Sequence, residues 1–217
     1  MVDSLVTKSE FPWLFSKLNL IWFLSFISTI PADEHTRFVY LILYAIGVFL
    51  AVFYSAGSFP LKYVGLGDVS VFLAFGPVLV AAGAYCSALD ASLIDIERIL
   101  ILTTPAAILV VGILHANNHR DLPVDATNNA MTVSVRLGDY YSKVYYKFLV
   151  LSPVVMSIAA SYYLERGAVL GALILPMSIR LIRLVGVREE IPRDIDAETA
   201  KIMLIYGVLT SLGIAVL

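Results

Sequence analysis

Long apolar runs recur along the chain, and they constrain its fold more than any other feature. Each run is close to the roughly 20 residues that an α-helix needs to cross the hydrocarbon core of a bilayer. The seven runs are Trp13–Ile30, Phe38–Tyr54, Val69–Leu89, Ile99–Ala116, Ser142–Leu164, Ala168–Leu184 and Ala200–Leu217. The first contains Lys17, whose long side chain can reach the interface from near a helix end. The pattern predicts an all-α polytopic membrane protein with about seven transmembrane helices.

The composition agrees with this interpretation. Of the 217 residues, 59% are apolar and 15% are charged, and one soluble core of this size could not bury so much apolar surface. The runs are apolar all round rather than striped, which argues against a soluble helical bundle. The connections are short, so we expect one membrane domain over residues 1–217. The net charge of −2 gives no indication of a nucleic-acid partner.

Seven crossings would divide the polar segments between two faces of the membrane. On one face we expect the N-terminus and the loops 55–68, 117–141 and 185–199. On the other we expect the loops 31–37, 90–98 and 165–167. Of the 15 Lys and Arg residues, Arg37, Arg98 and Arg166 belong to the second face and the others to the first. The positive-inside rule therefore predicts that the first face is cytoplasmic.

A dense polar cluster lies on that face between two apolar runs. Asp121 and Asp125 stand one helical turn apart, and Asn117, Asn118 and Arg120 precede them. Two carboxylates at this spacing can hold a hard cation such as Mg²⁺ through oxygen ligands. The amides and the guanidinium suit a ligand that brings the metal and its own negative charge, such as a diphosphate.

Helix capping is the alternative interpretation of the two aspartates. Asp121, which shortly precedes Pro123, resembles a helix start because proline is tolerated in a first turn. Capping does not explain Asn117, Asn118 and Arg120 at the end of a membrane span, where polar groups are costly and usually functional. We therefore predict a functional site here.

A second polar segment, Tyr54–Asp68, belongs to the same face. Its three glycines and one proline are typical of a structured turn region. Lys62 can act as a point charge on a phosphate, and Asp68 is a candidate further metal ligand. The alternative is an ordinary interfacial loop whose Lys62 meets lipid headgroups.

Other titratable groups are less informative. His115 and His119 could clamp a transition metal, but the neighbouring carboxylates and amides favour a hard ion, so we expect the histidines to line the site without ligating metal. The acidic residues between Glu189 and Glu198 are expected to be a solvated charge run on the same face, and the alternative is that one of them reaches the site.

The two polar segments resemble motifs of the UbiA superfamily of membrane-embedded aromatic prenyltransferases. NNHRDLPVD followed by TVSVRLG resembles the second aspartate-rich motif of that family. FPLKYVGLGD followed by VFLAFGP resembles the naphthoate-quinone branch, which makes menaquinones, and the ending DAETAKIMLIYGVLTSLG is similar to that branch too. ILHANNHRD resembles the animal-type enzyme that builds menaquinone-4 more than it resembles the bacterial naphthoate enzymes. The resemblance runs through essentially the whole chain.

This resemblance implies a partial version of a nine-helix bundle around a lipid-accessible pocket. It implies a prenyl diphosphate and an aromatic quinol as substrates, Mg²⁺ as cofactor, and an integral membrane protein with a cytoplasmic active face. If the chain is eukaryotic, it implies an endoplasmic reticulum or Golgi membrane. Asp121 and Asp125 would be the catalytic pair that binds the metal. The diphosphate would be contacted by Lys62, Arg120, Asn117 and Asn118.

The family's first motif, of the type NxxxDxxxxD, has no counterpart in this sequence. MVDSLVTKSEF resembles the stretch just after that motif, so we expect the chain to begin before the family's third span, without the first two helices. Two other functions therefore stay open. One is a truncated, non-catalytic membrane homologue that acts as a partner or regulator, and the other is an unrelated transporter.

Overall fold

The computed structural model describes residues 34–56, 60–87, 94–187 and 192–217. These residues form helices, with no strand among them, which confirms the predicted all-α class. The helices in chain order are α2 (Glu34–Ser55), η1 (Leu61–Val64), α3 (Gly67–Leu73), η2 (Ala74–Val78), α4 (Leu79–Ser87), α5 (Ile96–Arg120), α6 (Leu122–Thr127), α7 (Val133–Tyr163), η4 (Arg166–Ile174), α8 (Leu175–Val187) and α9 (Ile195–Val216).

Within the described residues, six helical rods are long and apolar enough to cross a membrane. They are α2, α3 with η2 and α4, α5, α7, η4 with α8, and α9. Each corresponds to one of the predicted apolar runs. The remaining predicted run, Trp13–Ile30, lies outside the described residues.

The polar stretch 117–141 differs most from its prediction as a loop. Helix α5 continues through Arg120, the short helix α6 follows, and α7 already begins at Val133. The early start of α7 is explained by Thr132, whose side-chain oxygen accepts a hydrogen bond from the backbone N–H of Val135 at 3.4 Å. The polar segment is therefore held by helical backbone rather than by an irregular loop.

Two rods are interrupted at glycines. Gly76 has φ −95° and ψ −106°, directly before Pro77, whose ring disfavours a helical conformation of the preceding residue. Gly138, inside α7, has φ +70° and ψ 170°, a conformation that L side chains rarely adopt. Helix α7 resumes directly afterwards, and Asp139 and Lys143 form an ion pair of 2.9 Å in the first turn after Gly138.

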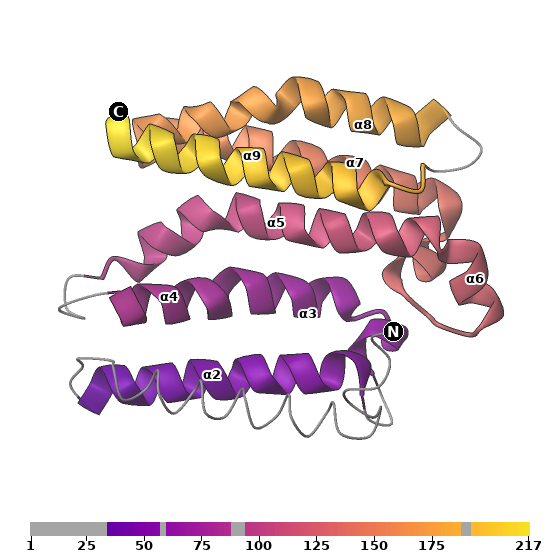
Figure 1. Cartoon of the computed structure of the whole chain (residues 1–217), viewed down its shortest axis with the longest axis horizontal. Helices are drawn as coiled ribbons and strands as arrows, with labels where there is room; N and C mark the ends of the chain where they lie inside the picture. The colour runs from indigo at the N-terminus through magenta and orange to yellow at the C-terminus, as the bar shows by residue number, and fades with distance from the viewer. Residues whose placement is uncertain (1–33, 57–59, 88–93, 188–191) are drawn as a thin grey trace, which may run out of the picture.

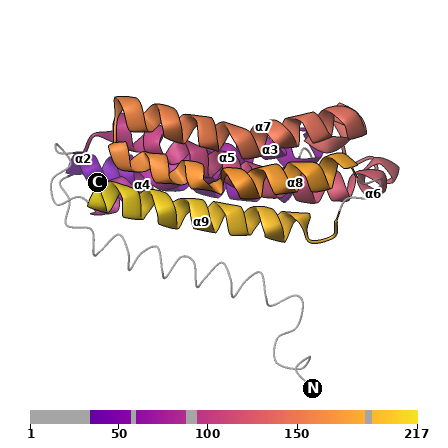
Figure 2. The same ribbon diagram turned by 90° about the horizontal axis from the view of Figure 1, so that it is seen from above.

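The rods run side by side, with α5 in the middle (Figure 1). On one side α5 packs against α7 and α9, and on the other against α3, η2 and α4, which in turn contact α2. Both views place α6 at the same end of the bundle (Figures 1 and 2). We call the end that contains η1, α6 and the start of α9 the polar end.

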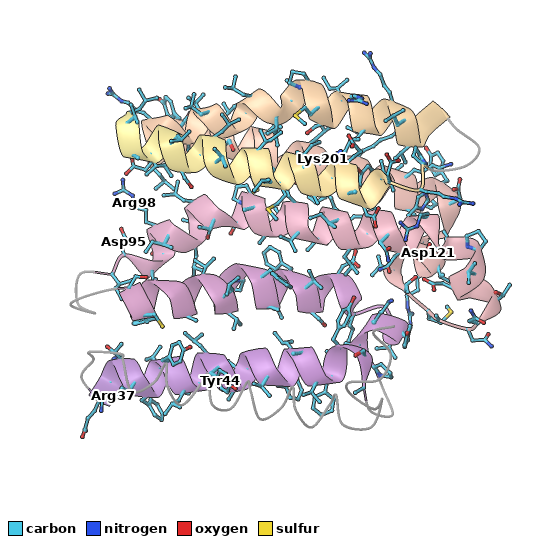
Figure 3. The ribbon with its side chains drawn as sticks, viewed as in Figure 1. Arg37, Tyr44, Asp95, Arg98, Asp121 and Lys201 are labelled. Carbon is cyan, nitrogen blue, oxygen red and sulfur yellow. The ribbon has the colours of Figure 1, made fainter. Side chains whose placement is uncertain are left out.

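The opposite end carries the residues that the predicted topology assigned to the second face. Figure 3 shows Asp95 and Arg98 at this end, away from Asp121 at the polar end. Arg98 forms an ion pair with Glu165 and donates a hydrogen bond to the carbonyl of Leu164 at 3.1 Å, which ties the start of α5 to the end of α7. The alternation of ends along the chain agrees with the predicted order of crossings.

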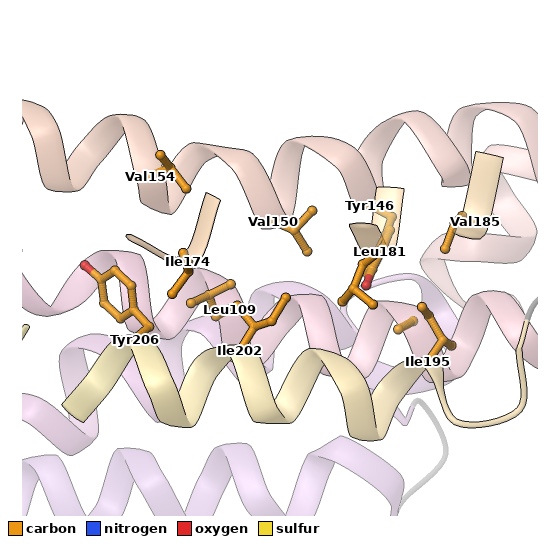
Figure 4. Packing of buried hydrophobic residues seen from close by; sticks show 11 residues of the cluster. Leu109, Tyr146, Val150, Val154, Ile174, Leu181, Val185, Ile195, Ile202 and Tyr206 are labelled. Carbon is orange, nitrogen blue, oxygen red and sulfur yellow. The ribbon is translucent and has the colours of Figure 1, made fainter. Parts of the chain in front are cut away.

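The core of the bundle lies between α5, α7, η4, α8 and α9 (Figure 4). Two hydroxyl pairs are buried within or beside it, Tyr146 with Thr199 at 2.7 Å and Ser157 with Tyr206 at 2.9 Å. Such pairs satisfy groups that would otherwise be unpaired in hydrocarbon. The remaining cluster members are aliphatic side chains such as Leu109.

The outer surface of the rods is apolar. Phe49, Val155 and Leu204 are 54%, 65% and 66% exposed, and many other large apolar side chains are exposed along the same rods. Such a surface would be costly in water, whereas the acyl chains of a bilayer solvate it. The exposed side chains therefore support the assignment as a polytopic membrane protein.

Candidate functional site

The junction of α5 and α6 positions the two predicted aspartates. Helix α5 ends at Arg120, and α6 begins at Leu122 with Pro123 in its first turn. The backbone N–H of Asp125 donates to the carbonyl of Asp121 at 2.9 Å, so the two residues are one helical turn apart. The carboxylate of Asp121 caps no backbone N–H of α6 among the described residues. It accepts hydrogen bonds from Arg120 instead, so capping does not account for this side chain.

Arg120 connects this junction to α9. Its Nη1 donates to Asp196 Oδ2 at 3.1 Å and to the carbonyl of Arg193 at 3.0 Å, and its Nη2 donates to Asn117. Asp196 was expected to be a solvated charge, and its ion pair with Arg120 corrects that expectation. Of the two predicted amides, Asn117 joins the Arg120 network, whereas Asn118 is buried with 2% of its surface exposed.

The pKa of Asp125 is affected by the charges of both Lys62 and Asp121. Burial raises the pKa of Asp125 above its ordinary value, the Lys62 ammonium lowers it, the Asp121 carboxylate raises it, and a hydrogen bond from Thr132 lowers it. The Thr132 hydroxyl lies 3.5 Å from Asp125 Oδ2. Lys62, on η1, is thus close enough to act electrostatically on Asp125 although 63 residues separate them in the sequence.

The η1 segment is fixed against the start of α7 at Gly65. Gly65 ends η1 with φ +77°, and a Cβ built there would overlap the guanidinium of Arg136. Arg136 itself donates from Nε to the carbonyl of Met131 at 3.3 Å. Sequence reasoning did not select Arg136, although it lies in the TVSVRLG motif, so the structure adds a second cation next to Gly65, three residues after Lys62.

A chain of buried polar groups lies beneath this surface. Asp68, the candidate further metal ligand, is 3% exposed, and its Oδ2 lies 3.2 Å from Nδ1 of His115. The Nε2 of His115 lies 2.9 Å from the hydroxyl and 3.1 Å from the carbonyl of Ser142. His119, one turn after His115, is 4% exposed, and neither ring nitrogen has a hydrogen-bond partner among the described residues. The histidines are therefore interior groups.

The residues present fit a Mg²⁺ ion that arrives with an anionic ligand. The described part of the chain contains no group of three or more His, Cys, Asp or Glu side chains that could hold a metal. Asp121 and Asp125 nevertheless offer two carboxylates at one turn spacing. Mg²⁺ is commonly bound by one or two carboxylates, with substrate phosphates and water completing its shell. The pair would thus supply the protein ligands of such a site, and phosphate oxygens and water would supply the others.

Comparisons with known proteins give the family. Residues 16–206 match the UbiA prenyltransferase family. The UbiA prenyltransferase domain-containing protein 1 of Danio rerio is 30% identical over 196 residues, which cover 90% of this chain and 54% of that protein. The 1,4-dihydroxy-2-naphthoate octaprenyltransferase of Mycobacterium tuberculosis is 30% identical over 166 residues, which cover 75% and 54%.

A third relative, the UbiA prenyltransferase domain-containing protein 1 of Dictyostelium discoideum, is 28% identical over 171 residues, which cover 78% of this chain and 50% of that protein. The chain thus spans about half the length of the curated relatives it matches. The family match extends over most of the chain and includes both polar segments that converge at the polar end. This chain belongs to the UbiA prenyltransferase family.

Proposed function

We propose that this chain transfers a prenyl group, within the membrane, from a prenyl diphosphate to an aromatic quinol, as in menaquinone biosynthesis. The observation that carries the proposal is the convergence of Lys62 with the Asp121/Asp125 pair at the polar end. Family membership supports prenyl transfer. A relative named as a naphthoate octaprenyltransferase supports a naphthoquinol-type acceptor.

Five polar side chains of the site have roles in this proposal, namely those of Lys62, Asn117, Arg120, Asp121 and Asp125. Lys62 and Arg120 bind the diphosphate and stabilise the negative charge that grows on it as it departs. Asn117 orients Arg120 through its hydrogen bond. Asp121 and Asp125 hold Mg²⁺, which when bound neutralises charge on the diphosphate as a Lewis acid. We restrict the metal site to these two carboxylates, because Asp68 is buried and engaged with His115.

The proposed reaction balances without an oxidant or reductant. The allylic C–O bond breaks, and its electron pair leaves with the diphosphate oxygen. A carbon of the electron-rich quinol ring forms the new C–C bond to the allylic carbon, and the ring then gives a proton to the released diphosphate. The apolar helices exclude water that would otherwise capture the allylic cation, and they provide a surface for the isoprenoid tail.

We further propose that the polar end faces the cytoplasm. Several cationic residues belong to segments at this end, namely Lys62, Arg120, Arg136, Lys143 and Arg193. The positive-inside rule associates such an excess of Lys and Arg with the cytoplasmic side. If the chain is eukaryotic, the membrane would be that of the endoplasmic reticulum or Golgi. A protease-accessibility assay on α6 in sealed vesicles of known orientation tests the direction.

A prenyl-transfer assay tests the function. The chain in membranes would be given geranylgeranyl diphosphate and a naphthoquinol, with Mg²⁺ or with a chelator. We expect a prenylated product that needs Mg²⁺ and that is lost with Asp125→Asn. The matched control is Asp139→Asn, a 65% exposed carboxylate at the same end, which should keep the product. Binding of the diphosphate without transfer would instead favour a non-catalytic homologue. The absence of both binding and transfer would refute the proposal.

A further inference from the structure

Three side chains join helices α3, α5 and α7 close to the polar end. Asp68 lies in the first turn of α3, His115 in the last turns of α5, and Ser142 near the start of α7. The imidazole of His115 stands between the other two, with Asp68 at 3.2 Å on Nδ1 and the Ser142 hydroxyl at 2.9 Å on Nε2. The three residues are separated by 47 and 27 positions, so the contacts are tertiary.

This Asp68–His115–Ser142 network is almost completely excluded from solvent. The exposed fractions are 3% for Asp68 and 0% for both His115 and Ser142. Leaving a buried polar group unpaired costs more free energy than a formed hydrogen bond contributes, so the partners resist separation. The Tyr145 ring also packs against His115 in a T-shaped arrangement, with ring centroids 4.7 Å apart. The imidazole is therefore held from three sides.

Two members of the network lie close in the chain to residues of the candidate site. Asp68 follows Lys62 by six residues, and the segment between them rests on Arg136 at Gly65. His115 precedes Arg120 by five residues on the same helix. A shift of Asp68 relative to His115 would thus move the Lys62 segment relative to the end of α5.

We propose that the Asp68–His115–Ser142 network is a positioning device that holds Lys62 in register with the Asp121/Asp125 pair. The network touches no ligand itself and acts through Lys62. It rests on the proposed function in one respect, namely that the groups it aligns bind a prenyl diphosphate. Pre-set alignment of this kind matters because displacements of about 1 Å can weaken a site by orders of magnitude.

The bundle offers a matched control. The Ser157–Tyr206 pair is also buried, also polar, and joins α7 to α9, but it lies further along α7, away from the polar end. Removing its hydrogen bond with Tyr206→Phe disturbs helix packing without disturbing the Lys62 segment. A general effect of losing a buried hydrogen bond would appear equally in this variant and in variants of the network.

Binding of geranylgeranyl diphosphate with Mg²⁺ to the purified full chain is the first test. We expect Asp68→Leu and His115→Leu to raise Kd by roughly tenfold or more, since a misplaced Lys62 no longer meets the diphosphate. Asp68→Asn, whose carbonyl oxygen can still accept from the imidazole, should restore most of the affinity. Tyr206→Phe should leave Kd unchanged. Equal affinity of Asp68→Leu and wild type would overturn the inference.

The second test measures position without any ligand. Cysteines replace Leu66 and Val124, which are 46% and 61% exposed, in a Cys86→Ser background, and both are spin-labelled. Electron paramagnetic resonance then gives the distribution of distances between the Lys62 segment and α6. We expect one narrow distribution in the parent and in Tyr206→Phe, and a broadened or shifted one in Asp68→Leu.

These two measurements separate the inference from the proposed function. If the parent binds no diphosphate, the proposed function fails, and the inference fails with it because there is no ligand to align. If the parent binds but Asp68→Leu keeps both the affinity and the distance distribution, the network is merely structural and the proposed function is untouched. A lower melting temperature of Asp68→Leu with unchanged affinity and distances would also contradict positioning.

Discussion

Arg120 and Asp121 form a two-point hydrogen bond between neighbouring side chains, with Nε at 2.9 Å and Nη2 at 3.2 Å from the two carboxylate oxygens. The same guanidinium also binds Asp196 on α9. Diphosphate oxygens are alternative acceptors with the same planar match to guanidinium. In the proposed function Arg120 therefore exchanges Asp121 for the diphosphate, and Asp121 becomes free to bind Mg²⁺.

Replacing Arg120 by lysine tests this exchange. Lysine keeps the positive charge but cannot make the planar two-point contact, so we expect Arg120→Lys to weaken binding of Mg²⁺ and geranylgeranyl diphosphate by roughly tenfold or more. Titration calorimetry on the purified chain measures the affinity. Asp196→Asn serves as the control, because it loosens the link to α9 and leaves the guanidinium in place. Similar affinities for Arg120→Lys and wild type would show that charge alone suffices.

The pH dependence of diphosphate binding should report Asp125. Its pKa lies above the ordinary value, chiefly through burial, so a proton competes with Mg²⁺ at a higher pH than for a solvated aspartate. Binding is present above the pKa of the folded state and is lost as the pH falls through it. The stability of the ligand-free protein should depend on pH in the opposite direction. The folded state holds the Asp125 proton more tightly than the unfolded state does, so protonated Asp125 adds to the free energy of unfolding at low pH. That contribution is lost as the pH rises through the pKa of Asp125 in the folded state.

Lys62→Met provides the comparison for that pH profile. Lys62 lowers the pKa of Asp125, so its removal should move the midpoint of the binding profile to higher pH, apart from any overall loss of affinity. Lys143→Met, which removes an ammonium paired with Asp139, should leave the midpoint in place. An unshifted midpoint in Lys62→Met would mean that the two charges do not interact.

The membrane architecture could be predicted from the sequence because hydrocarbon imposes a helix length on every span. Six described rods accordingly coincide with predicted runs. The spacing of Asp121 and Asp125 by one helical turn could also be predicted from the sequence, since the two residues are four positions apart. These features depend on neighbours in the chain, which a single sequence displays directly.

The tertiary contacts could not be predicted in the same way. Asp196 meets Arg120 across 76 positions, and Asp68 meets His115 across 47. No local periodicity encodes such pairs, so the sequence predicts a solvated Asp196 and offers Asp68 only as a candidate further metal ligand. The sequence predicts a late start of α7 for another reason. The apolar run begins only at Ser142, whereas the helix already begins directly after the capping residue Thr132.

Close packing of glycines should contribute measurably to the stability of the bundle. A Cβ on Gly167 would overlap the backbone of Gly213, where η4 approaches α9. Gly167→Ala should therefore force these helices apart and lower the free energy of unfolding by about 1–3 kcal/mol, the usual cost of overpacking. Gly207→Ala, on α9 with no atom within 4 Å of its added Cβ, is the control and should be neutral or slightly stabilising.

Unfolding of both glycine variants in detergent, followed by circular dichroism, checks this expectation. A lower transition temperature for Gly167→Ala than for Gly207→Ala is the expected order. The reverse order would mean that η4 and α9 do not pack through their glycines in the folded protein.

A double-mutant cycle on Lys62 and Asp125 tests most directly whether the two polar segments form one diphosphate site. The affinity of the purified chain for geranylgeranyl diphosphate would be measured with and without Mg²⁺ for wild type, Lys62→Met, Asp125→Asn and the double variant. We expect binding that requires Mg²⁺, a loss of roughly tenfold or more in each single variant, and a double variant weaker by clearly less than the product of the two losses. An affinity that changes neither with Mg²⁺ nor with the two substitutions would contradict a shared site, and so would the absence of binding by the wild type.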